Sequence, residues 1–201
     1  VVTWNDKGSG YHLGNVGPGN VVNTATVNNL IVPRFTAGHK FLSTSVTGSG
    51  FPDNILTVFT VVQKSASIVY HLGSGRFSPL QAGRFYIEDD AGSAKFYSNA
   101  YSGSFPTGTT FDIISVTQTR SGASVYVNGG TETTVTYTTP YGASDLLGLS
   151  VGASAYDSAQ CSLTGSVCEV ITYDGVLSST DHNDVGSYLA DKWGGAGVPA
   201  W

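Results

Sequence analysis

The order of apolar and polar positions along the chain predicts short strands separated by tight turns. Apolar and polar residues alternate within many short segments, as expected of strands with one buried face. Clusters of Gly, Ser, Pro and Asn, which favour turns, separate these segments. The clearest strand candidates are Ile55–Gln63, Ser67–Leu72, Arg84–Glu88, Lys95–Ser98, Phe111–Thr119, Ser124–Asn128, Thr131–Tyr137, Leu146–Val151 and Val167–Tyr173.

Two of these segments predict a hairpin. In Phe111–Thr119 the odd-numbered residues from Phe111 to Thr117 alternate with Asp112, Ile114, Val116 and Gln118. Ser124–Asn128 follows and runs into the glycine turn Asn128-Gly-Gly130. Burial of one face would fix the register of this pair.

A single helix is expected near the C-terminus. Ser178 or Ser179 can cap it, and Asp181 lies in the first turn, where a carboxylate favours the positive end of a helix. Gly194-Gly195 ends it. The residues expected on one apolar face are Val185, Tyr188, Leu189 and Trp193. We expect this helix to cover a sheet edge or one end of the molecule.

These elements predict an all-β fold, a two-sheet antiparallel β-sandwich of the jelly-roll type with one short C-terminal helix. The chain has 201 residues, the length of one domain, and contains no repeat, charge block or long linker. We therefore expect a single domain spanning residues 1–201.

Composition excludes several partners. Charged residues make up only 11% of the chain, and the formal net charge is −5. Nucleic acid and anionic bilayers both need clustered Lys and Arg, so neither is an expected partner. The longest apolar run, Ile55 to Val62, is interrupted by Thr57 and Thr60 and is too short for membrane insertion.

The chain contains no Met and begins at Val1, which predicts a processed product or a fragment of a longer protein.

The C-terminal part of the chain resembles a known family. Gly165–Ser178, followed by Tyr188–Gly194, closely resembles the last strand and terminal helix of laminin-G-like domains, which belong to the concanavalin A-like lectin and glucanase superfamily. Three earlier segments are similar in the same order: Val2–Gly10 resembles the opening tryptophan and glycine turn, Pro33-Arg-Phe35 the first core strand, and Val125–Gly129 the midway hairpin. The resemblance implies a jelly roll. It does not fix the activity, because the superfamily includes lectins, adhesion modules, glycoside hydrolases and virion surface proteins.

Glycoside hydrolysis needs two carboxylates facing each other across a groove. Glu occurs only at Glu88, Glu132 and Glu169, and Glu88-Asp89-Asp90 is the sole acidic cluster. Glu88 and Asp90 alternate on one face, but the next position of that face is Gly92, so the pattern of the superfamily's hydrolases is incomplete. We therefore predict that the protein is not an enzyme. A hydrolase remains an alternative if Glu88 or Glu169 finds a partner across a groove.

The sequence requires no cofactor, and calcium is the candidate that it offers. Calcium prefers six to eight oxygen ligands, commonly from carboxylates and loop carbonyls. The candidate ligands are Asn5, Asp6, Glu88 and Asp90, none of them in a fixed-spacing motif. Capping of a turn by Asn5 and Asp6 explains the first loop equally well without a metal.

A carbohydrate site combines an aromatic face with groups that bind hydroxyls. Such residues fall in expected loops, and the candidates are Asn99, Tyr101, Tyr141, Tyr156 and Asp157. Loop anchoring is the alternative role of each. The four histidines, His12, His39, His71 and His182, show no zinc-binding spacing and are interpreted as surface residues.

Cys161 and Cys168 flank a possible two-residue turn at Thr164-Gly165. Such a turn would set the two cysteines opposite each other across a hairpin, at a separation that suits a disulfide. The bridge would imply an oxidising, extracellular setting, and its alternative is two buried thiols.

The favoured hypothesis is a non-catalytic module, extracellular or on a virion surface, that binds carbohydrate or a surface polysaccharide, or mediates adhesion, through loops at one rim. The alternative is a structural decoration or fibre protein of a phage virion or an extracellular filament. That protein would dock on capsid, tail or filament proteins and on identical copies of itself.

Overall fold

The structure, a computed structural model, describes the backbone of residues 3–4, 13–16, 23–35, 40–47, 55–64, 68–74, 85–90, 93–98, 100–106, 111–136, 147–152, 163–196 and 200–201. Side chains are described for residues 24–35, 55–63, 111–136, 151–152, 163–195 and 200–201.

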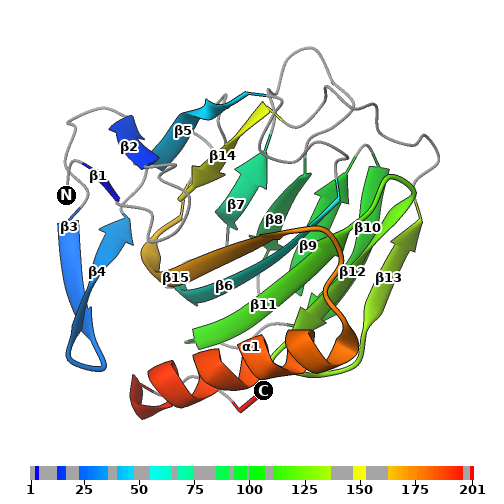
Figure 1. Ribbon diagram of the computed structural model, residues 1–201. Helices are drawn as coiled ribbons and strands as arrows, with labels where there is room; N and C mark the ends of the chain where they lie inside the picture. Colours follow the sequence, from blue (N-terminus) through cyan, green and yellow to red (C-terminus); the bar gives the residue numbers. More distant parts are fainter. Residues whose placement is uncertain are drawn as a thin grey trace.

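The described strands form two antiparallel sheets (Figure 1). The seven-stranded sheet contains, in spatial order, β13 (Thr133–Thr136), β12 (Gly122–Val127), β11 (Phe111–Gln118), β6 (Leu56–Lys64), β15 (Gly165–Asp174), β4 (Leu30–Phe35) and β3 (Asn23–Val27). The eight-stranded sheet contains β1 (Thr3–Trp4), β2 (Leu13–Val16), β5 (Lys40–Thr47), β14 (Leu147–Val151), β7 (Ile68–Ser74), β8 (Phe85–Asp90), β9 (Ser93–Ser98) and β10 (Ala100–Pro106). The expected mostly-β fold is confirmed.

Each of the nine expected strand segments contains a strand, and the expected hairpin is formed by β11 and β12. Its register sets Ile114 opposite Val127 and Gln118 opposite Ala123. Asn128 and Gly129 both adopt positive φ, at 52° and 63°, in the turn that follows β12. The Asn128 side chain fixes this corner, because its Oδ1 accepts a hydrogen bond from the Ile113 amide at 2.8 Å.

The central strands of the seven-stranded sheet are buried on both faces. Every residue of β6 from Leu56 to Val62 is buried, and so is β11 from Phe111 to Val116. One face packs against the helix, in a core made of Val27, Val32, Phe59, Val61, Phe111, Ile113, Cys168, Leu189 and Trp193. The alternate residues, such as Val58 and Val116, fill the opposite face.

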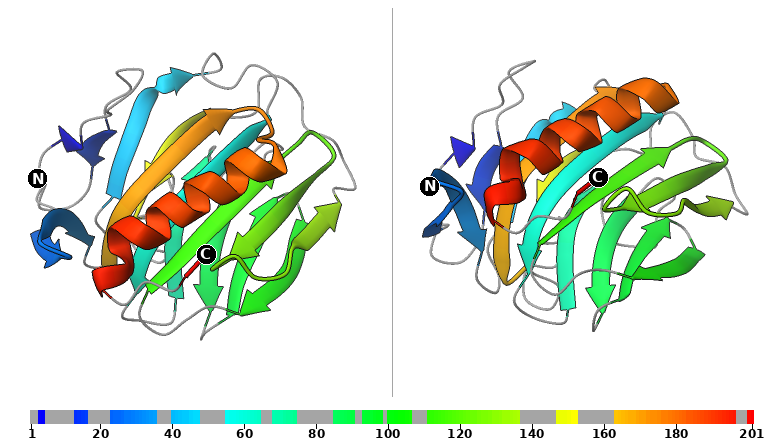
Figure 2. Two further views of the ribbon diagram at one scale, coloured as in Figure 1. Left: turned by 60° about the horizontal axis from the view of Figure 1, so that its bottom comes forward. Right: turned by 90° about the horizontal axis from the view of Figure 1, so that it is seen from below.

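Helix α1 (Ser179–Trp193) begins at the predicted cap and is followed by the short 3-10 helix η1 (Gly194–Ala196). The Ser178 hydroxyl accepts a hydrogen bond from the Asp181 amide at 3.1 Å. We expected the helix to cover an edge or an end of the molecule, and this expectation was wrong. It lies across the outer face of the seven-stranded sheet (Figure 2), because that face is as apolar as the inner one.

The buried face of α1 also differs from the expected one. It consists of His182, Gly186, Leu189 and Trp193. Tyr188, expected on this face, is 48% exposed, and His182, expected at the surface, is only 8% exposed. The observed buried face is therefore rotated about the helix axis by part of a turn relative to the expected one. Among the described residues, no helix combines the length and apolar character that crossing a membrane requires.

Candidate functional site

The pairing of the strands identifies the outer face of the eight-stranded sheet. Residues directly opposite each other in an antiparallel ladder lie on the same face of the sheet. Val151 of β14 is fully buried and lies opposite Leu72 of β7, which lies opposite Ile87 of β8 and, through it, Phe96 of β9. At the end of β14, Gly152 packs against the ring of Phe35 in the other sheet. The face with Val151 and Ile87 is therefore the inner one.

The alternate positions of β8, β9 and β10 share the outer face and carry a row of aromatic residues. Tyr86 lies opposite Tyr97, and Tyr97 lies opposite Tyr101, so three tyrosines cross three adjacent strands in one row. The next row sets Glu88 opposite Lys95. We call the aromatic and charged positions on this face of β7 to β10 the tyrosine face: Tyr70, Tyr86, Glu88, Asp90, Lys95, Tyr97 and Tyr101.

The chemistry of these residue types suits a polyhydroxylated ligand. Tyrosine offers an apolar ring together with a polar hydroxyl, and carboxylates accept hydrogen bonds from hydroxyl groups. Strands in a sheet lie about 4.8 Å apart, so the tyrosine row extends over about 10 Å. No described helix lies over this side of the molecule (Figure 1).

The structure brings three of the predicted site residues to this one face. Tyr101, predicted in a loop, is instead the second residue of β10, while Glu88 and Asp90 share a face as predicted. The other predicted ligands lie outside the described residues: Asn5, Asp6, Asn99, Tyr141, Tyr156 and Asp157. Sequence reasoning missed Tyr70, Tyr86, Lys95 and Tyr97. The alternation in Phe85-Tyr-Ile-Glu88 and Lys95-Phe-Tyr97 was the signal that could have identified three of them.

The described residues provide only part of what a calcium site or a hydrolase site requires. Glu88 and Asp90 supply two carboxylates on one face, and no group of three His, Cys, Asp or Glu residues suited to a metal occurs among the described residues. Asp89 belongs to the inner face, and Gly92 lies outside the described residues. Calcium binding by Asn5, Asp6, Glu88 and Asp90 stays a prediction.

A second cluster surrounds His182, between α1 and the seven-stranded sheet. His182 Nε2 lies 2.6 Å from Ser115 Oγ, and the imidazole ring lies 4.9 Å from the Phe59 ring and 4.7 Å from the Tyr126 ring. Burial lowers the pKa of His182, against weaker opposing effects of Asn183 and Glu132. Ser115 is fully buried, so this Ser–His pair cannot meet a substrate and holds the helix to the sheet.

A third cluster joins α1 to β15. Glu169 Oε1 accepts a hydrogen bond from Lys192 Nζ at 2.8 Å, and Glu169 Oε2 accepts one from Trp193 Nε1 at 2.8 Å. Burial opposes the charge on Lys192, but the bonds to Glu169 and to the Tyr188 hydroxyl outweigh it and raise the pKa of Lys192. Glu169 therefore anchors the helix to the sheet, and both of its carboxylate oxygens are already engaged.

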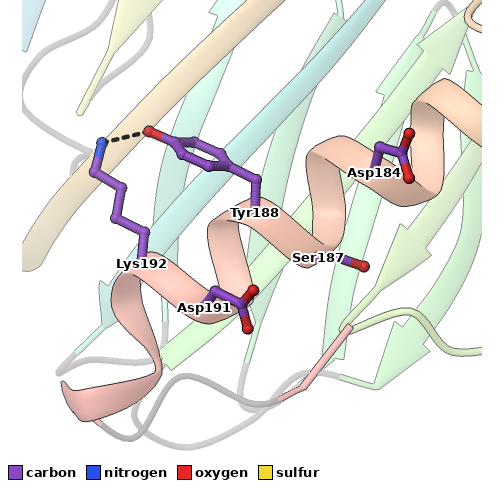
Figure 3. Close-up of a pocket in the computed structure, with 5 residues that line it drawn as sticks. All are labelled: Asp184, Ser187, Tyr188, Asp191 and Lys192. Carbon is purple, nitrogen blue, oxygen red and sulfur yellow. Dashed lines mark hydrogen bonds between the residues drawn. The ribbon is translucent and has the colours of Figure 1, made fainter.

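A shallow hollow lies on the solvent side of the same helix (Figure 3). It is lined by Asp184, Ser187, Tyr188, Asp191 and Lys192, all from α1. The Lys192 ammonium group is already engaged by Tyr188 and Glu169. Because a single helix lines this hollow and its Lys192 is already hydrogen-bonded, the hollow is a weak binding surface.

Cys168 does not form the predicted disulfide in the structure. It is a free, buried thiol, and burial, together with the nearby Glu169 charge, raises its pKa to about 12. The expected turn at Thr164-Gly165 is wrong, because Gly165 begins β15 and pairs with Phe35 on one side and Lys64 on the other. The predicted partner, Cys161, lies outside the described residues.

Comparison with solved structures identifies a shared fold at low sequence identity. The Trypanosoma rangeli sialidase matches 90% of the chain with a TM-score of 0.64 and 19% identity, and the chain spans about 30% of its length. The CBM40 of the Ruminococcus gnavus IT-sialidase, bound to α2,3-sialyllactose, matches 74% of the chain and is itself 91% covered, with a TM-score of 0.59 and 14% identity. The chain shares its fold with carbohydrate-binding modules.

A second binding domain gives the same result. Domain 4 of the extracellular GH43 arabinanase from Geobacillus stearothermophilus, in complex with arabinotriose, matches 86% of the chain and is 87% covered, with a TM-score of 0.61 and 12% identity. No protein-family model matches the sequence, and no curated protein matches it either.

Proposed function

We propose that this chain is a non-catalytic carbohydrate-binding module, a two-sheet β-sandwich of the jelly-roll type that binds glycan on the tyrosine face. The observation that carries the proposal is the register of β8, β9 and β10, which aligns Tyr86, Tyr97 and Tyr101 in one row. The row lies on the face opposite the one that carries the buried Val151 and, through strand pairing, Ile87. An aromatic surface flanked by carboxylates is the combination that sugar rings and their hydroxyl groups require.

The comparisons support binding over catalysis. Two of the matched structures, a CBM40 with sialyllactose and an arabinanase domain with arabinotriose, are covered by this chain over most of their length. The sialidase, in contrast, is only 30% covered, so most of that enzyme has no counterpart here. No comparison favours the alternative of a virion decoration or fibre protein.

Two further parts of the proposal concern the setting of the site. We place the module outside the cell, where polysaccharides are accessible. We also propose that the predicted loop residues Asn99, Tyr141, Tyr156 and Asp157 extend the tyrosine face. In the sequence, Asn99 lies between β9 and β10, two residues from both Tyr97 and Tyr101 of the tyrosine row.

The test is binding of the purified protein to a broad glycan array, in calcium and in EDTA. We expect binding to at least one glycan class, and Tyr97→Ala, which removes the middle ring of the row, should weaken it about tenfold or more, equivalent to ~1.4 kcal/mol. Tyr188→Ala is the matched control, because Tyr188 is an exposed tyrosine on α1. Binding lost in EDTA would assign calcium to the site, and binding unchanged would exclude it.

Absence of binding to every glycan, in both buffers and with multivalent display, would contradict the proposal. Binding that Tyr188→Ala weakens and Tyr97→Ala leaves intact would move the site to the helix side.

A further inference from the structure

The turn after β12 contains the one Asn-Gly sequence of the chain, Asn128-Gly129. In such a pair the backbone nitrogen of the glycine can attack the side-chain carbonyl carbon of the asparagine, because glycine has no side chain to obstruct the approach. The outcome is deamidation, a spontaneous reaction that needs only water. Asn128 is therefore a candidate modification site, and it lies in the other sheet from the proposed glycan site.

In the folded protein, three hydrogen bonds hold Asn128 against β11. Its backbone amide donates to the Ile113 carbonyl oxygen at 2.8 Å, and its Oδ1 accepts from the Ile113 amide at 2.8 Å. Its Nδ2 donates to Asp112 Oδ1, also at 2.8 Å. Both ends of the carboxamide are thus engaged on β11, so Asn128 Cγ can turn toward the Gly129 nitrogen only if both side-chain bonds break.

Packing closes the same corner. Asp112 is only 1% exposed, and a Cβ placed on Gly129 would overlap the main chain of Trp201. The Trp201 ring itself packs against Phe59 and His182. Deamidation therefore has to wait for a local opening of the turn, and its rate follows the population of the opened state.

The product of the reaction fits the closed corner poorly. Deamidation replaces Nδ2 by an oxygen, which cannot donate a hydrogen bond, so an acceptor would face Asp112 Oδ1 where a donor now lies. Two carboxylates in contact at a buried position repel each other. The isoaspartate form also adds a methylene group to the main chain, which displaces the backbone bond to Ile113.

We propose that Asn128 is a deamidation site that its contacts with β11 keep unreactive in the folded protein, and that the product weakens the corner once it has formed. In the reaction, a bond forms between Gly129 N and Asn128 Cγ, the Cγ–Nδ2 bond breaks, and ammonia leaves with the proton of the Gly129 amide. Water then opens the resulting succinimide at either carbonyl, giving aspartate or isoaspartate. Each opening of the turn thus carries a chance of a lasting loss of stability.

The experiment incubates the wild-type protein at one pH and temperature, native and unfolded in urea, and follows residue 128 by mass spectrometry of peptides. We expect deamidation of Asn128 in urea, and a rate at least about tenfold lower in the native protein, because the reaction waits for local opening. Asn29 is the internal control, since it has a similar positive φ of 61° but is followed by Leu30, and it should stay intact in both samples.

A substitution tests the consequence without waiting for the reaction. Asn128→Asp should lower the urea midpoint of unfolding more than Asn29→Asp does, because the control adds the same charge at an exposed turn residue. Equal deamidation rates in the native and unfolded protein would overturn the protection by β11, and no deamidation in urea would overturn the site. Equal midpoint shifts of the two variants would overturn the repulsion at Asp112.

Discussion

At the scale of single residues, the buried imidazole of His182 is the clearest case of a role that the sequence did not indicate. A dispersed histidine on a polar helix is usually a surface residue, and we predicted one here. In the structure its ring is packed between Phe59, Tyr126 and Trp201, and it bonds a buried hydroxyl. The signal was its spacing of four, seven and eleven residues from Gly186, Leu189 and Trp193, which places all four on one helical face.

The protonation of His182 should make the stability of the protein depend on pH. Burial lowers its pKa below the ordinary value of 6.5, so the unfolded chain binds a proton at a higher pH than the folded chain does. The full contribution to stability is present above about pH 6.5 and decreases as the pH falls below that value. Urea unfolding at pH 7.5, 6.5 and 5.5 measures it.

The control for this prediction is His182→Gln, which keeps a neutral hydrogen-bonding side chain but cannot gain the charge. The other three histidines are present in both proteins, so the difference in pH dependence belongs to His182. The same loss of stability with falling pH in both proteins would contradict the assignment.

Cys168 should behave as an inert thiol. In the native protein, burial and a pKa of about 12 leave almost no thiolate at neutral pH, so a thiol reagent should react very slowly. In denaturant without reductant, we expect two titratable thiols, because Cys168 is free in the structure. A count of zero, with the mass of the chain two units lower than the reduced form, would show a disulfide between Cys161 and Cys168.

At the scale of elements, the sequence predicted the existence of strands and of the helix better than it predicted where the helix docks. Local signals identified the cap at Ser178, the Asn128-Gly129 turn and the period-two pattern of β11. The docking of α1 depends on the outer face of β6, β11 and β15 being apolar. The sequence of a central strand that is buried on both faces is a nearly continuous apolar run. Such a run does not show which element covers each face.

The packing around α1 predicts opposite effects of the same substitution at Gly186, within the helix, and at Gly194, which follows it. A Cβ at Gly186 would overlap the ring of Trp201, so Gly186→Ala should lower the free energy of unfolding by about 1–3 kcal/mol. Gly194 has helical φ and nothing within 4 Å of such a Cβ. Gly194→Ala should therefore raise the free energy of unfolding by about 0.4–1 kcal/mol.

Chemical denaturation followed by circular dichroism measures both variants. Equal destabilisation by the two alanines would show that Trp201 does not pack on Gly186.

At the scale of the whole molecule, the two outer surfaces differ in what covers them. One is closed by α1, which is held in place by the bond of Lys192 to Glu169 of β15 and the bond of His182 to Ser115 of β11. The other is free of described helices and carries the tyrosine face. The sequence predicted a carbohydrate-binding module with its site in rim loops, whereas the site that we propose lies on strands. Tyr101 illustrates why, since Ser102-Gly-Ser104 around it resembles a loop and only pairing with β9 shows a strand.

The alignment of residues from separate strands could not be predicted from local patterns. Tyr86, Tyr97 and Tyr101 come together through the register of β8, β9 and β10, and a shift of one residue in any strand would move its tyrosine to the opposite face. The sequence contains the residues of the proposed site, and strand pairing brings their positions together.

The most direct test of the tyrosine face is to map the backbone amides that change when the protein binds the best glycan from the array. Two-dimensional NMR of the labelled protein, free and saturated, gives this map. We predict that the changes concentrate in residues 85–90, 93–98 and 100–106, the strands β8, β9 and β10. Changes confined to residues 179–193 of α1, with the three strands unaffected, would contradict the account.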